Sequence, residues 1–261
     1  MLIWHIKNPK RKKRKQRNEM SFNAEGLVVK ETSYGDNDKI LTVLVRGKGK
    51  MQLWARGCKR MKSPLLSTAH TFTYAQFSVA ESKGSYTIRS AQLIDNFYSL
   101  RENLDRLALS EYVAELASRC VMDNDESDGV LALTLNTLYL LSNTEKRIDL
   151  IKACYEMRLM CETGYLPVLD GCTLCGTTEG RMFFECAQGG IVCERCGKGT
   201  EINVALIKAL AHICYADCKS VFSFALGDSN LKRLSVICEK YLIYHLGFEP
   251  KTLSFYKLLQ R

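Results

Sequence analysis

The sequence lacks any long apolar run. Nowhere among its 261 residues do about eighteen apolar residues follow one another, the length that a membrane-spanning helix needs. The N-terminus also lacks the apolar core of a secretory signal peptide and carries a cluster of Lys and Arg instead. We therefore expect a folded protein of the reducing cytoplasm, with no membrane partner. Its twelve cysteines should be free thiols or metal ligands there.

The sequence also lacks the short motifs of common enzymes. It has no Gly-x-x-x-x-Gly-Lys-Ser/Thr phosphate-binding loop, no His-Glu-x-x-His and no Gly-x-Ser-x-Gly. Its four histidines, at positions 5, 70, 212 and 245, are too scattered to indicate a catalytic triad. These absences predict a protein that binds, that does not catalyse and that uses no nucleotide. An enzyme that works through a metal ion or a free thiol stays open as an alternative.

Asp and Glu are missing from residues 39–80. The formal net charge of +9 comes from residues 1–80, because residues 81–261 hold twenty Lys/Arg against twenty-three acids. A run of charge is usually only a solvated surface, but a long acid-free segment rich in strands favours a polyanionic partner. The candidate nucleic-acid-binding residues in this segment are Lys39, Arg46, Lys48, Lys50, Trp54, Arg56, Lys59, Arg60 and Lys62.

Aromatic side chains are interspersed with these cations. Trp54 lies between two basic loops and is the best candidate for stacking on a base. Phe72, Tyr74, Phe77 and Tyr86 are further candidates, but strand alternation should place at least half of these aromatic residues in a protein core.

The pattern of the chain predicts an α+β protein of two folded domains. Residues 1–20, with eight Lys/Arg and one acid, are expected to form a disordered basic arm. Residues 21–98 alternate in five short β-branched runs with tight turns, which predicts a small Greek-key barrel such as a five-stranded OB-fold β-barrel. Residues 99–261 change to a helical period and predict an all-α domain.

Four cysteines interrupt this helical part in two matched pairs. Cys172 and Cys175 precede Cys193 and Cys196 by a spacing at which four thiolates can close a tetrahedron around one Zn²⁺. The apolar stretch between the pairs predicts a hairpin, so a zinc element is expected over residues 168–200. A site filled by four protein ligands is structural and not catalytic. Cys186 lies within the hairpin and is a rival ligand.

Several of these segments together resemble a known family. Residues 24–32 and 34–42, the Ala55-Arg-Gly57 loop, Phe72-Thr-Tyr74 and the four-cysteine element with Gly189-Gly190 resemble bacterial DNA repair proteins of the RecO family. The resemblance covers about residues 22–260, and the basic arm departs from it. It implies an OB-fold, a helical domain with a zinc element and non-enzymatic work on DNA in the bacterial cytoplasm, at the nucleoid.

The resemblance also implies partners. Such proteins bind single- and double-stranded DNA, anneal complementary strands, engage the acidic C-terminal tail of the single-stranded DNA-binding protein, and with RecR help to load RecA. Lys232, Arg233 and Lys240, on a predicted helix, are candidate contacts for that tail, although exposed helical charges often serve solvation alone. Composition by itself leaves a second reading open: an RNA-binding OB-fold protein with a zinc ribbon, linked to translation or RNA processing.

Overall fold

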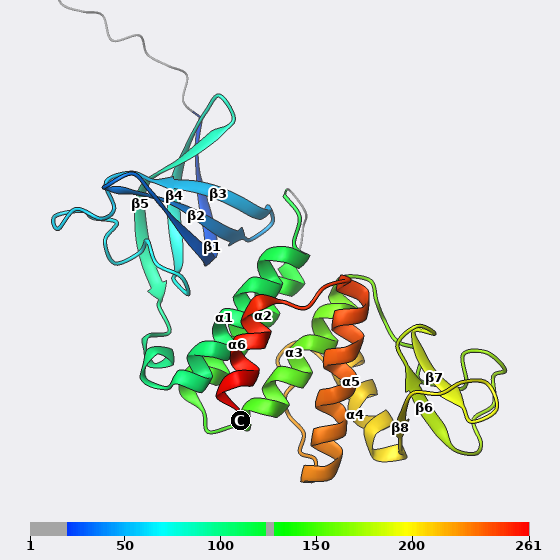
Figure 1. Ribbon diagram of the computed structural model, residues 1–261. Coiled ribbons are helices and arrows are strands. Elements are labelled where there is room, and N and C mark those ends of the chain that lie inside the picture. Colours follow the sequence, from blue (N-terminus) through cyan, green and yellow to red (C-terminus); the bar gives the residue numbers. More distant parts are fainter. Residues whose placement is uncertain (1–19, 124–127, 261) are drawn as a thin grey trace, which may run out of the picture.

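The computed structural model describes residues 20–123 and 128–260 (Figure 1). The predicted basic arm lies outside the described residues, apart from Met20 at its end. The described part consists of a β-barrel, a layer of helices and a small three-stranded sheet inserted between two of the helices.

The barrel is built from five strands. They are β1 (Met20–Tyr34), β2 (Asp38–Val45), β3 (Gly49–Ala55), β4 (Tyr74–Ser82) and β5 (Ser85–Asp95), closed in the order β1-β2-β3-β5-β4. β1 is long because its first half pairs with β4 and its second half with β2. The parallel pairing of Leu53 with Tyr86 closes the ring between β3 and β5. The predicted five-stranded barrel is confirmed.

Alternation along the strands fills the barrel with apolar side chains. Val28, Leu41, Val43, Leu53 and Phe77 are all buried in its interior. The other side of β1 faces the helices, since Leu27 and Val29 belong to the larger core that the helices form. The barrel therefore packs directly against the helical layer and is not joined to it only by a linker.

The helical layer follows the barrel. Its elements are the 3₁₀ helix η1 (Tyr98–Glu102), α1 (Leu104–Cys120), α2 (Asp128–Asn143), α3 (Ile148–Glu162), α4 (Val204–Tyr215), α5 (Asp228–Leu246) and α6 (Lys251–Leu259). The side chains of Asn103 and Asn203 cap α1 and α4 by accepting from backbone N–H groups of the first turn. α5 ends at Gly247, which adopts the left-handed conformation that favours glycine.

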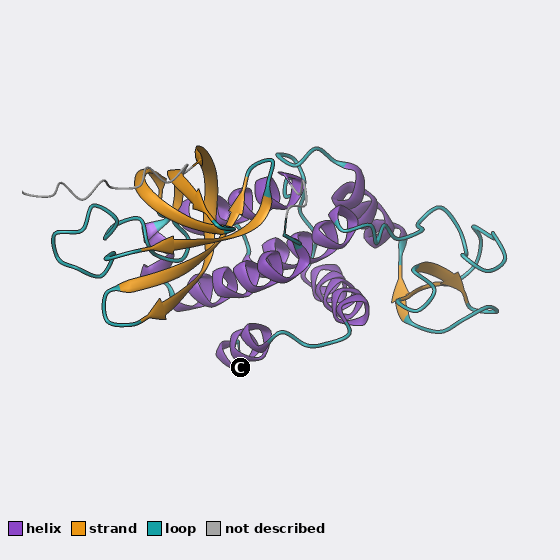
Figure 2. Cartoon of the chain, turned by 90° about the horizontal axis from the view of Figure 1, so that it is seen from above, coloured by secondary structure: helices purple, strands orange, loops and turns teal. Residues whose placement is uncertain are grey.

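The inserted sheet consists of β6 (Met182–Glu185), β7 (Gly190–Cys193) and β8 (Thr200–Ile202), in the order β7-β6-β8. The pairing of β6 with β7 confirms the predicted hairpin. Figure 2 shows that this sheet and the barrel lie at opposite ends of the helical layer. None of the described helices is both long and apolar enough to cross a membrane.

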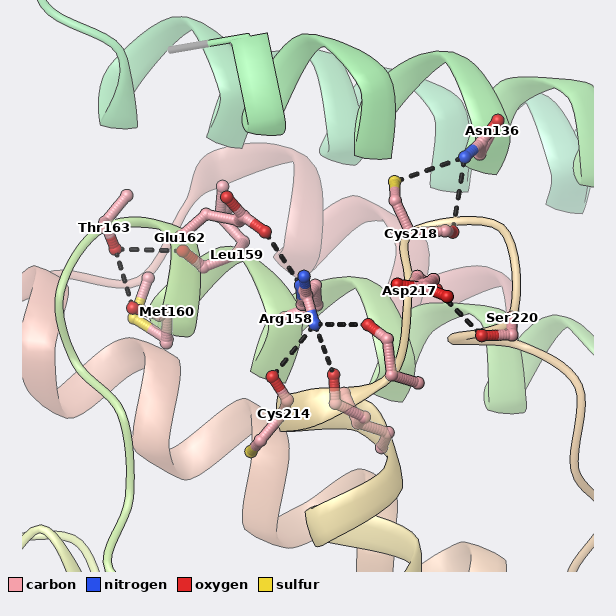
Figure 3. Close-up of polar contacts among 12 residues, drawn as sticks. Asn136, Arg158, Leu159, Met160, Glu162, Thr163, Cys214, Asp217, Cys218 and Ser220 are labelled. Atoms are coloured by element: carbon pink, nitrogen blue, oxygen red, sulfur yellow. Dashed lines mark hydrogen bonds and ion pairs between the residues drawn. The ribbon is translucent and has the colours of Figure 1, made fainter.

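Arg158 fixes α4, the helix that follows the inserted sheet, to α3. Its Nη1 donates to the carbonyl oxygens of Ile213, Cys214 and Ala216 at distances of 2.9 to 3.2 Å, and its Nε pairs with Glu162 at 2.8 Å (Figure 3). The carbonyls at a helix C-terminus have no partner within the helix, and a cation there also opposes the helix dipole. One guanidinium thus satisfies three acceptors at the end of α4.

Replacing Arg158 with Lys should therefore destabilise the protein although the charge is kept. The ammonium group of Lys is a compact charge, whereas the planar guanidinium of Arg158 donates from separate nitrogens to the carbonyls of α4 and to Glu162. Lys cannot make both sets of hydrogen bonds in this geometry. We expect a loss of about 2 kcal/mol in the free energy of unfolding, measured in urea. Arg181→Lys is the matched control, because Arg181 and Glu201 form an ion pair between side chains that are 65% and 47% exposed, and it should cost less than about 0.5 kcal/mol. Equal stability losses in the two variants would contradict the role given to Arg158.

Candidate nucleic-acid interface and metal centre

The predicted cations do not all reach the surface. Lys39 is only 9% exposed, and its Nζ donates to the carbonyl of Ala69 at 2.8 Å and to Glu31 at 3.1 Å. These contacts tie β2 to β1 and to the loop before β4. Lys39 therefore lies apart from the exposed cations, in a position that holds the barrel together.

The turn between β2 and β3 carries three of the predicted cations in three different environments. Arg46 pairs with Glu25 at 2.9 Å and donates to the hydroxyl of Tyr74 at 3.1 Å. Hydrogen bonds from Tyr74 and Arg46 lower the pKa of Glu25, so this carboxylate stays charged and keeps Arg46 occupied. Lys48 is exposed, with its Nζ 4.9 Å from the ring centroid of Phe22. Unlike Arg46, Lys48 forms no ion pair with a carboxylate of the described residues.

Lys50 is drawn toward the helices. Its Nζ donates to the carbonyl of Ser118 at 3.1 Å and lies 3.9 Å from the carboxylate of Asp123. Both partners come from the end of α1 and the segment that follows it. Lys50 therefore helps to fasten the barrel to the helical layer.

The loop between β3 and β4 presents the remaining cations. Arg56, Arg60 and Lys62 are exposed, and Lys59 is half-buried with its Nζ 3.4 Å from the carbonyl of Gly35. Backbone hydrogen bonds shape the loop: the N–H of Gly57 donates to Asp38 at 2.7 Å, and that of Lys59 donates to Asn37 at 3.1 Å. Among the described residues, no carboxylate forms an ion pair with any of these four cations. This loop is the largest group of unpaired cations in the predicted set.

Aromatic rings lie beside these cations on the barrel surface. The rings of Tyr34 and Trp54 meet edge to face at 4.7 Å, with the guanidinium of Arg56 6.0 Å from the indole. Phe22 and Tyr86 form a second edge-to-face pair at 6.0 Å. Two neighbouring surface hollows, of about 290 and 420 Å³, share Met51 and Tyr86, with Trp54 lining the first and Phe22 the second; we call the two together the aromatic groove.

The five aromatic residues predicted from the sequence divide between this groove and the interior. Phe72 and Phe77 are buried, and Tyr74 is bound to Glu25 and Arg46. Phe72 also lies just before β4, with φ 69°. Trp54 and Tyr86 line the groove. Sequence reasoning missed Phe22, Tyr34 and Asp123, which the pairing of the strands and the docking of the helices bring to the same surface.

The four predicted metal ligands come together at the other end of the molecule. The sulfur atoms of Cys172, Cys175, Cys193 and Cys196 all lie within 4.8 Å of one another, and those of Cys175 and Cys193 are 3.7 Å apart. A zinc–sulfur bond of about 2.3 Å in a tetrahedron implies sulfur separations of this order. Backbone N–H groups lower the pKa of the Cys172 thiol, while hydrogen bonds with Cys175 and Cys193 raise that of Cys196, as expected for thiols close enough to share protons. The cluster can hold a metal ion such as zinc.

The knuckles owe their shape to their glycines. Gly176 has φ 75° and donates its N–H to the carbonyl of Cys172 at 2.8 Å, which closes the first turn. In the second turn, a Cβ on Gly197 would lie 2.9 Å from the side chain of Val192. Cys186 is outside the cluster: it packs against the core, and burial raises the pKa of its thiol.

The three predicted contacts for a partner lie on α5. Lys232, Arg233 and Lys240 are exposed, and Val236 between them is 44% exposed. Lys240 and Tyr244 line a hollow of about 250 Å³ with Phe184 and Cys186 of the inserted sheet. Cationic and apolar groups thus occur together along one helix surface.

Both halves of the chain match known proteins. Residues 20–97 match the model for the N terminal of recombination protein O, and residues 101–254 match that for its C terminal. The DNA repair protein RecO of Acetivibrio thermocellus is 32% identical over 241 residues, which cover 90% of this chain and 96% of that protein. The DNA repair protein RecO of Caldicellulosiruptor bescii is 28% identical over 239 residues, 90% of this chain and 98% of that protein.

Proposed function

The chain belongs to the RecO family of non-enzymatic DNA repair and recombination proteins, and from this premise we propose that its barrel binds single- and double-stranded DNA. The observation that carries the proposal is the loop of residues 56–62. Arg56, Arg60 and Lys62 are exposed there and pair with no described carboxylate, and Arg56 borders the aromatic groove. In this proposal the loop and Lys48 hold phosphates, while Trp54 and Tyr86 stack on bases.

Annealing of complementary strands follows from the same surface. Two strands meet only if their mutual repulsion is screened while their bases stay free to pair. Cations that hold phosphates without reading sequence provide the screening, and stacking on aromatic rings is weak enough for a base to leave. No nucleotide hydrolysis is needed, so the protein acts as a binding mediator in the bacterial cytoplasm, at the nucleoid.

The helical half serves in this proposal as a docking surface. The acidic, apolar C-terminal tail of the single-stranded DNA-binding protein is placed along α5, with its acids on Lys232, Arg233 and Lys240. Val236, Tyr244 and the hollow beside Lys240 suit its apolar end. With RecR, the protein would then help to load RecA. One Zn²⁺ per chain, held by the four cysteines, keeps the inserted sheet folded against α5.

An annealing assay on strands precoated with the single-stranded DNA-binding protein tests this function. The wild type should anneal coated strands, and removing the tail from the coat should slow annealing roughly tenfold. A Lys232→Ala/Arg233→Ala/Lys240→Ala variant should anneal coated strands slowly whether or not the coat protein carries its tail. It should anneal naked strands at the wild-type rate. Lys208→Ala/Lys219→Ala/Lys251→Ala removes the same charge from exposed positions off α5 and is the control. If the first triple variant responds to the tail like the wild type, the placement on α5 is wrong.

A further inference from the structure

The smaller of the two hollows on the barrel groove holds a carboxylate. This hollow of about 290 Å³ is lined by Lys50, Gln52, Trp54, Tyr86 and Asp123, together with Met51, Gly84 and Ser85. Asp123 comes from the segment after α1 and is fixed at the start of β3, where the N–H of Lys50 donates to the carbonyl of Met122 at 3.2 Å. The side chain of Asp123 is 76% exposed, and its 3.9 Å separation from the Nζ of Lys50 is longer than a hydrogen bond, so its oxygens can still accept from a ligand.

The charges in this hollow do not suit a phosphate. Lys50 is its single cation, and the Nζ of Lys50 already donates to Ser118 at 3.1 Å and lies 3.9 Å from Asp123. A phosphate bound in this hollow would lie close to the carboxylate of Asp123, and the two negative charges would repel each other. The part of a nucleotide that fits is therefore the base, which can stack on the exposed parts of Trp54 and Tyr86. The volume lies at the small end for ligand pockets and suits one base.

An ionised carboxylate only accepts hydrogen bonds, and its two oxygens favour a pair of adjacent donors. Guanine presents such a pair on its Watson–Crick edge, the N1–H and the 2-amino group. Cytosine and adenine present one amino group beside an acceptor, and thymine presents one N–H between two carbonyls. We infer that this hollow is a base-binding subsite that prefers guanine in a single strand, with Asp123 accepting from N1–H and the 2-amino group. This inference rests on the proposed binding of single-stranded DNA.

Binding of short labelled oligonucleotides to the full chain, followed by fluorescence anisotropy, tests the inference. The probes are a thymine-only strand, the same strand with separated guanines, and a third with hypoxanthine in place of guanine, which lacks the 2-amino group. The wild type should bind the guanine strand about fivefold more tightly than the thymine strand, with the hypoxanthine strand between them. Asp123→Asn should reduce this discrimination to less than about twofold, because an amide oxygen accepts more weakly than a carboxylate and its NH₂ opposes a donor.

Asp36→Asn is the matched control, since Asp36 is an exposed acid of the barrel that does not line the hollow. It makes the same change of charge and should leave the guanine preference intact. Equal affinity of the wild type for all three probes, with binding still falling steeply in salt, would overturn the guanine subsite and leave the proposed DNA binding standing. So would a guanine preference that survives Asp123→Asn. If no single strand binds even at low salt, the proposed function itself fails, and the subsite fails with it.

Discussion

Reversing Lys48 and three cations of the loop of residues 56–62 should nearly abolish DNA binding. In a variant with Lys48→Glu, Arg56→Glu, Arg60→Glu and Lys62→Glu, we expect the affinity for single-stranded DNA to fall by about two to three orders of magnitude at low salt. Each lost phosphate contact also removes the release of a counterion, so the slope of log affinity against log salt should become shallower by roughly 3. Anisotropy titrations at several salt concentrations measure both quantities.

The control for this variant must carry the same total charge. Lys198→Glu, Lys208→Glu, Lys219→Glu and Lys232→Glu change four exposed lysines of the helical half. None of these positions lines the groove, and charges beyond a Debye length of about 10 Å at 0.1 M salt are largely screened. The control should therefore bind DNA almost like the wild type. If both quadruple variants lose affinity and salt slope equally, binding depends on net charge and the assignment to the groove is wrong.

The choice of these four cations shows where sequence reasoning stops. The acid-free run of residues 39–80 identifies a basic surface, but it does not reveal which cations are already paired. Glu31 reaches Lys39 through the pairing of β1 with β2, and Asp123 reaches Lys50 only because the segment after α1 docks on the barrel. Folding thus brings acids from outside the acid-free run into contact with cations inside it. The free cations are Lys48 in the turn between β2 and β3 and those of the loop of residues 56–62, which none of the described carboxylates reaches.

The aromatic groove was harder to predict for a different reason. Simple alternation from Ala24 and Val28, which face the barrel interior, would turn Tyr34 inward as well. The pairing of β1 with β2 shifts register between Val28 and Lys30, and this irregularity reverses the side to which later residues point. Tyr34 is consequently exposed beside Trp54. A one-residue irregularity of this kind leaves no clear signal in the sequence.

The cysteine cluster, by contrast, could be predicted almost completely. Two Cys-x-x-Cys knuckles carry their own geometry, because the spacing and the following glycines are local features. What the sequence did not show is how deeply the element enters the core. Phe184 of β6 packs edge to face on Tyr241 of α5, with ring centroids 5.3 Å apart, and Ile191 and Val192 are buried with them. The metal element and the helical layer therefore share one hydrophobic core.

This shared core predicts that loss of the metal will be costly for the whole helical half. Cys175→Ser, at the most exposed of the four ligands, should abolish stoichiometric zinc and lower the free energy of unfolding by at least about 4 kcal/mol, since metal binding to such sites is coupled to folding. For a chain of this size the melting temperature should fall by roughly 8 to 16 °C. The barrel has its own core, so DNA affinity well below the new melting temperature should change little. Metal analysis, thermal unfolding with and without a chelator, and DNA titration measure the three effects.

Cys186→Ser, in the same hairpin but outside the cluster, should retain one zinc ion per chain and its melting temperature. If Cys186→Ser lost the metal while Cys175→Ser kept it, the ligand set would be wrong. If Cys175→Ser lost DNA affinity while still folded, the metal element would belong to the DNA-binding surface and not only to the helical core.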